Sequence, residues 1–154
     1  MSTPSIRLGQ PSDLAKLATL STALWPESPL EEHSRELALI LAGKPPGILP
    51  LVVFVAEASD GSLVGFLEAG LRSHADGCES SHPVGYIEGW FVVESHRRQG
   101  IGAALVLAAE DWARSQGCIE IASDTQITNL LSQSAHAALG YEITERSILY
   151  RKRL

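Results

Sequence analysis

The stretch WFVVESHRRQGIGAA, residues 90–104, decides the fold of this chain. Residues 90–93 are aromatic and β-branched, a composition typical of a buried strand. A basic turn with two glycines follows at 97–102, and the segment after it has the amphipathic pattern of a helix. This order favours an anion site, because the first N–H groups of a helix are unpaired and lie at the positive end of its dipole.

The turn differs from two common phosphate-binding loops. It lacks the GxxxxGK[ST] pattern of nucleoside triphosphatases, and position 105, where GxGxxG requires a third glycine, is a leucine. It matches R/Q-x-x-G-x-G/A through Arg97, Gly100 and Gly102. Directly after an apolar strand, this pattern resembles the pyrophosphate-binding loop of the GNAT N-acetyltransferases. The alternative is a basic loop that binds no ligand.

Composition restricts the class of protein and its partners. A chain of 154 residues favours one domain, residues 1–154. The net charge of −6 argues against nucleic acid or an anionic membrane as partner and suits a cationic substrate. Cys78 and Cys118 have no metal-binding spacing, so we expect reduced thiols, no metal and a cytoplasmic protein. We also expect neither a membrane span nor a signal peptide.

The segments on either side of this stretch predict an α/β fold with a mixed, mostly antiparallel central sheet flanked by about four helices. Strands are expected at residues 5–8, 51–58, 63–71, 84–93 and 118–123, and two short ones at 141–147 and 148–153. Helices are expected at residues 13–24 (with Ser12 as N-cap), 29–42, 103–116 and 129–139. Gly89, inside the central strand, predicts a bulge or a close backbone approach. This element order is that of the GNAT fold, so the resemblance extends over nearly the whole chain.

Three carboxylates are candidates for binding or deprotonating an amine. Glu88 lies in an apolar strand, Asp124 follows the carboxyl end of a strand, where ligand sites gather, and Glu145 lies in the predicted C-terminal hairpin. Each has a purely structural alternative: a solvent-facing strand residue, a turn cap and a member of a solvated face, respectively. A backbone N–H within residues 90–92 would polarise a carbonyl if a bulge opens the strand.

One position departs from the family pattern. Many GNAT enzymes have a tyrosine that protonates the leaving thiolate, seven residues after an asparagine and four before the glycine that closes a helix. In this chain the frame is Asn129, His136 and Gly140, so a histidine occupies the tyrosine position. His136 is a candidate replacement, since histidine titrates near neutrality. A core or surface role for His136 is the alternative.

Four segments narrow the resemblance to the aminoglycoside 6′-N-acetyltransferases. They are LWP at 24–26, YIEGWFV at 86–92, ASDT at 122–125 followed by Asn129, and ALGYEITERSILYRKRL at 138–154. The resemblance implies an acetyl-CoA site formed by Trp90, Phe91, Val92, Arg97, Arg98, Gln99, Gly100, Ile101, Gly102, Ala103 and Asn129. It also implies an aminoglycoside site formed by Trp25, His74, Glu88, Asp124 and Glu145, with Asp124 or Glu88 nearest the reacting amine. His74 stands where relatives often have a tyrosine, and Trp25 has the alternative of a core-edge aromatic.

The resemblance therefore implies acetyl-CoA as co-substrate, an aminoglycoside antibiotic as acceptor, resistance as the outcome and a homodimer as the assembly. Direct attack in a ternary complex is the expected mechanism, because neither cysteine has an obvious base beside it in sequence. The catalytic candidates are Asp124, Glu88 and His136. Two alternatives stay open: acetylation of another amine (a polyamine, an amino sugar or a protein N-terminus), and a non-catalytic acyl-CoA-binding domain.

Overall fold

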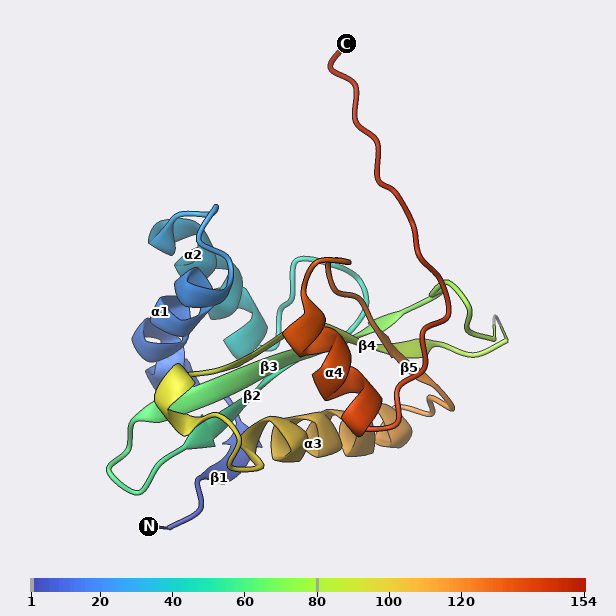
Figure 1. Cartoon of the computed structure of the whole chain (residues 1–154). Coiled ribbons are helices and arrows are strands. Elements are labelled where there is room, and N and C mark those ends of the chain that lie inside the picture. Colours follow the sequence, from blue (N-terminus) through green and yellow to red (C-terminus); the bar gives the residue numbers. More distant parts are fainter. Residues whose placement is uncertain (1, 80) are drawn as a thin grey trace.

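The computed structural model describes residues 2–79 and 81–154, and it has one sheet of five strands with helices on both faces (Figure 1). The strands are β1 (Ser5–Leu8), β2 (Leu51–Glu57), β3 (Leu63–Arg72), β4 (Val84–Val92) and β5 (Ile121–Ser123), in that order across the sheet. All neighbours are antiparallel except the parallel pair β4–β5. The helices are α1 (Leu14–Leu24), α2 (Leu30–Leu41), α3 (Ile101–Ser115) and α4 (Leu130–Ala138). The expected mixed, mostly antiparallel sheet with four helices is confirmed.

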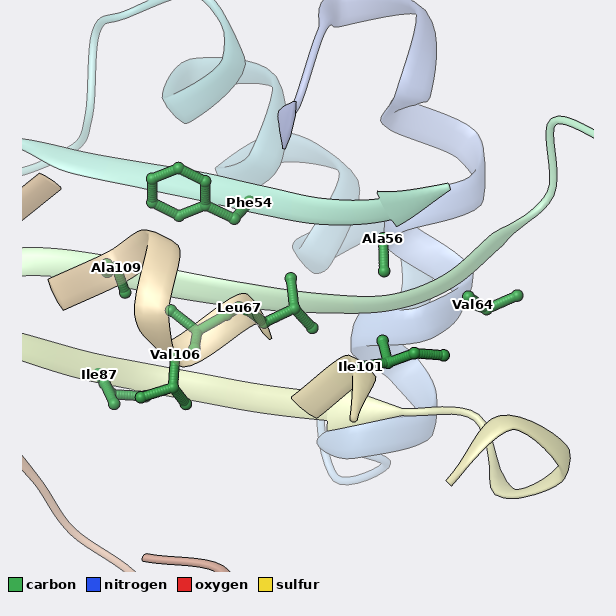
Figure 2. Packing of buried hydrophobic residues seen from close by; sticks show 10 residues of the cluster. Phe54, Ala56, Val64, Leu67, Ile87, Ile101, Val106 and Ala109 are labelled. Carbon is green, nitrogen blue, oxygen red and sulfur yellow. The ribbon is translucent and has the colours of Figure 1, made fainter. Parts of the chain in front are cut away.

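Two hydrophobic cores lie on opposite faces of the sheet. Because side chains alternate along a strand, Phe66 of β3 packs with α1 and α2, whereas its neighbour Leu67 packs with α3. Figure 2 shows the α3 side, where Leu67 and Val106 meet between helix and strands. Both faces of the central strands are therefore covered, which explains why β2 to β4 are almost continuously apolar in sequence.

The predicted bulge in β4 is present. Glu68 of β3 pairs with Gly89 and Ala69 pairs with Ile87, so Glu88 is an extra residue without a partner on β3. With the Trp25 indole in this position residue 89 has to be glycine, because a Cβ there would overlap the ring. The bulge and the end of α1, where Trp25 follows the last helical residue, are thus packed directly on each other.

Three local expectations were wrong. Ser12 is not an N-cap; it lies inside a short 3₁₀ turn, Pro11–Asp13, that precedes α1. The residue that stabilises this helix start is Asp13, whose Oδ2 accepts the N–H of Gln10 at 2.8 Å. The strand expected at 118–123 is shortened to the three residues of β5.

The third error concerns the C-terminal segment. Residues 141–154 form no strand, although two were expected, and the end of this segment extends away from the body (Figure 1). Leu149 and Tyr150 are 95% and 90% exposed. A strand requires a neighbour to accept its backbone hydrogen bonds, and no backbone hydrogen bond joins residues 142–154 to another described segment. One side-chain bond, from the Thr144 hydroxyl to the Asp76 carbonyl at 3.3 Å, is present. Among the described helices, none is long and apolar enough to cross a membrane.

We expect Asp13→Ala to lower the free energy of unfolding by about 2 kcal/mol, because Asp13 is buried and pairs with Arg7 at 2.7 Å. Arg7, mainly through its hydrogen bond, lowers the pKa of Asp13. The stabilisation is therefore present above the ordinary carboxyl pKa and disappears as the pH falls through the lowered one. Urea unfolding of wild type and variant at pH 7 and pH 3 measures this difference.

The matched control is Asp111→Ala. Asp111 pairs with Arg114 at the same 2.7 Å, but both side chains are well exposed, so the change should be within about 0.5 kcal/mol. Equal losses for the two variants at pH 7 would contradict the role given to Asp13.

Candidate active site

The turn between β4 and α3 forms a backbone cradle. Arg98 and Gly100 have φ values of 60° and 81°, in the left-handed region that non-glycine residues rarely adopt. No side chain caps α3, and its first backbone hydrogen bond runs from the Ala104 N–H to the Gly100 carbonyl at 3.0 Å. The N–H groups of residues 101–103 therefore have no partner within the helix. Left-handed turn residues before an uncapped helix start create a concave anion site.

Two arginines of this turn have different surroundings. Arg97 donates from Nε to the Val92 carbonyl at 2.8 Å, so it ties the turn to the end of β4. Arg98 is exposed and makes no side-chain hydrogen bond to the described residues. Arg98 is consequently the guanidinium that is free to meet an anion at the helix start, whereas Arg97 already has a structural partner.

Next to the turn, β4 and β5 separate. Their pairing ends at Ile87 and Ser123, although β4 continues for five residues against β3. The Val93 N–H donates to Val64 of β3 at 2.9 Å, so strand alternation directs the N–H groups of Trp90 and Val92 away from β3, toward the gap. Free N–H donors of this kind can polarise a carbonyl oxygen that enters between the strands.

The Trp90 indole lies between α3 and α4. A Cβ at Gly102 would lie 3.0 Å from the indole Cζ2, so the second residue of α3 must be small for the ring to pack there. The ring is edge-on to His136, with 5.4 Å between centroids. The indole Nε1 is buried and has no hydrogen-bond partner among the described residues, which leaves one donor beside the gap unused.

His136 is held by hydrogen bonds at both ring nitrogens. Its Nδ1 lies 2.7 Å from the Ser132 carbonyl and its Nε2 lies 2.9 Å from the Ser123 hydroxyl. Since a carbonyl oxygen only accepts, Nδ1 is assigned the proton and Nε2 accepts from Ser123 in the neutral ring. Tyr141 packs edge-on from the other side, at 5.5 Å between centroids. His136 is therefore a partly buried, oriented ring beside the end of β5, and it is not a free surface residue.

The structure joins Glu88 and Asp124 through two residues that sequence reasoning missed. Arg72 donates to both oxygens of Glu88 at 2.9 and 2.7 Å, and its guanidinium lies 3.4 Å from the centroid of the Tyr86 ring. The Tyr86 hydroxyl donates to Asp124 at 2.5 Å. Burial, and then the bond to Asp124, raises the pKa of Tyr86, which keeps the hydroxyl a donor. The only sequence signal for Tyr86 is its position two residues before Glu88, which places both side chains in the same strand.

The candidate substrate residues surround two hollows. His74, Asp124 and His136 line a cavity of about 870 Å³ beside β4, β5 and α4, together with Glu145 of the C-terminal segment. Trp25 and Glu88 instead line a recess of about 260 Å³ between α1, α2, β3 and β4.

The Arg72–Glu88 pair connects the two hollows, because Arg72 lines the first and Glu88 the second. Asp124, His74 and Glu145 are exposed, so they can meet a solvated cation. Trp25 was expected either to bind the substrate or to pack at the edge of the core. It packs at the edge of the core and also lines the recess.

Two further groups bear on the chemistry. Asn129 caps α4, because its side-chain oxygen accepts the Ser132 N–H at 3.0 Å, and its expected contact with a co-substrate stays a prediction.

Cys78 is partly buried and Cys118 is buried, and burial raises the pKa of both thiols. Thiols with raised pKa values are poor nucleophiles, which argues against an acyl-enzyme on either cysteine.

Comparison with known proteins shows one family. The model of the acetyltransferase (GNAT) family matches residues 14–141. A Klebsiella aerogenes protein named aminoglycoside N(6′)-acetyltransferase type 1 is 44% identical over 153 residues, which cover 99% of each chain. A structure of AAC(6′)-Iy with the bisubstrate analog CoA-S-monomethyl-acetylneamine aligns with TM-score 0.88 and 40% identity over 99% of this chain and 100% of that one. AAC(6′)-Iy with CoA aligns with TM-score 0.89 and 39% identity over 100% and 97%.

Proposed function

Because this chain belongs to the acetyltransferase (GNAT) family, we propose that it transfers the acetyl group of acetyl-CoA to the 6′-amine of aminoglycoside antibiotics and so confers resistance to them. The supporting observation is the gap between β4 and β5, with an uncapped helix start at one end and exposed carboxylates at the other. These two ends have opposite electrostatic character. They suit a phosphate-bearing thioester and a polycationic amine, respectively.

Acetyl-CoA is the co-substrate, and it supplies an acetyl group already activated as a thioester. The backbone N–H groups of residues 101–103, with the Arg98 guanidinium, are suited to its pyrophosphate. The N–H groups of Trp90 and Val92 are suited to its thioester carbonyl oxygen. No group of three metal-binding side chains converges within residues 2–79 and 81–154, and this chemistry requires no metal.

The acceptor amine attacks the acetyl carbon directly. The new C–N bond forms as the C–S bond breaks, the amine proton passes to a carboxylate, and the thiolate takes up a proton. Asp124 and Glu88 are the carboxylates proposed to orient the ammonium group and accept its proton. His136, which occupies the tyrosine position of related enzymes, is the proposed proton donor to the thiolate in its imidazolium form, because the single proton of the neutral ring is held by the Ser132 carbonyl. Cys78 and Cys118 take no part, since burial keeps both thiols protonated.

We propose that the protein acts as a homodimer in the cytoplasm, where unpaired thiols persist. Residues 141–154 support the dimer, because Ile148, Leu149 and Tyr150 leave most of their surface exposed on an unpaired, extended backbone. Such a segment is suited to pair with a second copy of the chain. The acidic charge argues against nucleic acid as a partner.

Acetyl transfer is tested by free-thiol release from acetyl-CoA with two acceptors, kanamycin B and kanamycin C, which carry an amine and a hydroxyl at carbon 6′. We expect release with the amine only, because the hydroxyl is a much weaker nucleophile. Release with both would contradict the 6′ assignment. Release with neither, while CoA still binds, would favour another amine acceptor or a non-catalytic acyl-CoA-binding domain.

Asp124→Asn should lower kcat/KM for the 6′-amine acceptor by about a hundredfold, the scale of a general base or an amine-positioning carboxylate. The amide keeps an oxygen that can accept from Tyr86, so the fold should be retained. Asp111→Asn, which removes an exposed carboxylate from α3, serves as the matched control and should leave kcat/KM unchanged. Wild-type rates for Asp124→Asn would remove this residue from the site.

Truncation after Ser147 removes the exposed apolar residues of the tail and should convert the dimer to a monomer. Light scattering coupled to size-exclusion chromatography measures the mass directly. The control is a chain that ends at Tyr150, which loses three cations and Leu154 but keeps Ile148, Leu149 and Tyr150, and it should remain dimeric. A monomeric full-length chain would contradict the proposed assembly.

A further inference from the structure

The smaller recess contains polar groups that the reaction above does not use. It lies between α1, α2, β3 and β4, and its lining residues are Ser21, Trp25, Glu27, Ser28, His33, Glu36, Leu37, Glu68 and Glu88. Glu68 is partly buried at the middle of β3, next to fully buried apolar neighbours. Its carboxylate makes no hydrogen bond or ion pair with any described residue.

Ser21 provides an independent sign that the recess is built for a ligand. It is 0% exposed, it lines the recess from α1, and its Oγ has no hydrogen-bond partner among the described residues. A helical serine ordinarily satisfies its hydroxyl by bonding to a carbonyl one turn earlier, as Thr22 does with Ala18 at 2.8 Å. A buried hydroxyl without a partner is costly, and a polar ligand group that reached it from the recess would supply the missing hydrogen bond.

The charge of the recess selects a cation. Burial first, and then the charges of Glu36 and Glu88, raises the pKa of Glu68 to about 7. A positive group beside Glu68 would remove this penalty, because it stabilises the ionised carboxylate. The described side chains here do not converge as a metal site. An ammonium group suits the set better, since it donates three hydrogen bonds that carboxylates and a serine oxygen can accept.

The recess lies next to the part of β4 that faces the proposed reaction site. Glu68 pairs with Gly89 at the bulge, directly before Trp90, whose N–H faces the gap between β4 and β5. Trp25 closes the recess from the end of α1 and stacks on His33, with 6.1 Å between ring centroids. His33 itself is fixed through Nε2 on the Trp25 carbonyl at 3.0 Å. A volume of about 260 Å³ has room for one aminated ring and not for a whole aminoglycoside.

From this geometry we infer that the recess is a second ammonium subsite, in which Glu68, Glu36 and the Ser21 hydroxyl bind an amino group of the polycationic acceptor other than the one that is acetylated. The inference rests on the proposed acetyl transfer. It assigns Glu68 as a residue that determines specificity for acceptors with several amines, and it gives Glu68 no part in the transfer of the acetyl group.

The test is the dissociation constant of kanamycin B, measured by titration calorimetry at pH 8 without acetyl-CoA. Glu68→Gln should weaken binding about tenfold, while the affinity for CoA stays unchanged. Glu31→Gln removes the same charge from an exposed position on α2 outside the recess, and it should bind as wild type does. A constant within twofold of wild type for Glu68→Gln would overturn the subsite. A loss confined to kcat, with unchanged binding, would also overturn it, since Glu68 would then be a proton acceptor.

Ser21→Ala keeps the test decisive even if Glu68→Gln folds poorly. Removing an unpaired buried hydroxyl from a helix should leave the melting temperature unchanged or raise it, yet binding of kanamycin B should weaken several-fold. Equal binding by Ser21→Ala would count against the subsite.

Proton release gives a further readout. The charged or titratable groups that face Glu68 are Glu27, His33, Glu36 and Glu88, the last with its partner Arg72. Binding at pH 6.5 should release a proton in wild type, seen as a buffer-dependent enthalpy, and release less in Glu68→Gln. Equal release would contradict the assignment. If wild type binds kanamycin B but does not acetylate it, the acetyl-transfer proposal fails while these binding measurements still decide the subsite.

Discussion

The packing of the Trp25 indole against Gly89 is the contact on which the arrangement of the site depends. No side chain larger than hydrogen fits at position 89, because a Cβ would overlap the ring. The bulge there displaces Glu88 from regular pairing, and Glu88 then reaches Arg72. Beyond the bulge, β4 remains on β3 but has separated from β5. The close approach of Trp25, at the end of α1, to β4 therefore lies at the same place as the bulge, the Glu88 carboxylate and the point where β4 and β5 separate.

Charge is divided along this opening. The basic turn and the free N–H groups of α3 lie at one end of the gap, where they favour phosphate. Carboxylates lie around the other end, and Arg72 and Tyr86 connect two of them across three strands. Arg72 neutralises the charge of Glu88, whereas no described side chain forms an ion pair with Glu68. The two carboxylates therefore differ: Glu88 has a cationic partner within the chain, and Glu68 does not.

Sequence reasoning succeeded where the signal is local. The turn at 97–102 and the bulge glycine are each recognised from neighbours within a few residues, and both are present in the structure. It failed for Ser12, because Asp13 competed for the same helix start through an ion pair with Arg7 that the local pattern does not reveal. It failed for the C-terminal strands as well, since strand formation depends on a partner strand and alternation alone does not supply one.

The sequence by itself determined the order of the elements and the anion-binding turn, because helix, strand and turn preferences are set by residues close together along the chain. Only the tertiary structure decided which polar groups meet. Arg72 and Glu88 are 16 residues apart and Tyr86 and Asp124 are 38 apart, and their contacts exist because β3, β4 and β5 are neighbours in one sheet. The same packing leaves Ser21 without a partner and desolvates Glu68. The unpartnered hydroxyl of Ser21 and the desolvated carboxylate of Glu68 result from the helices and strands packed around them. The residues next to them in the sequence do not determine either feature.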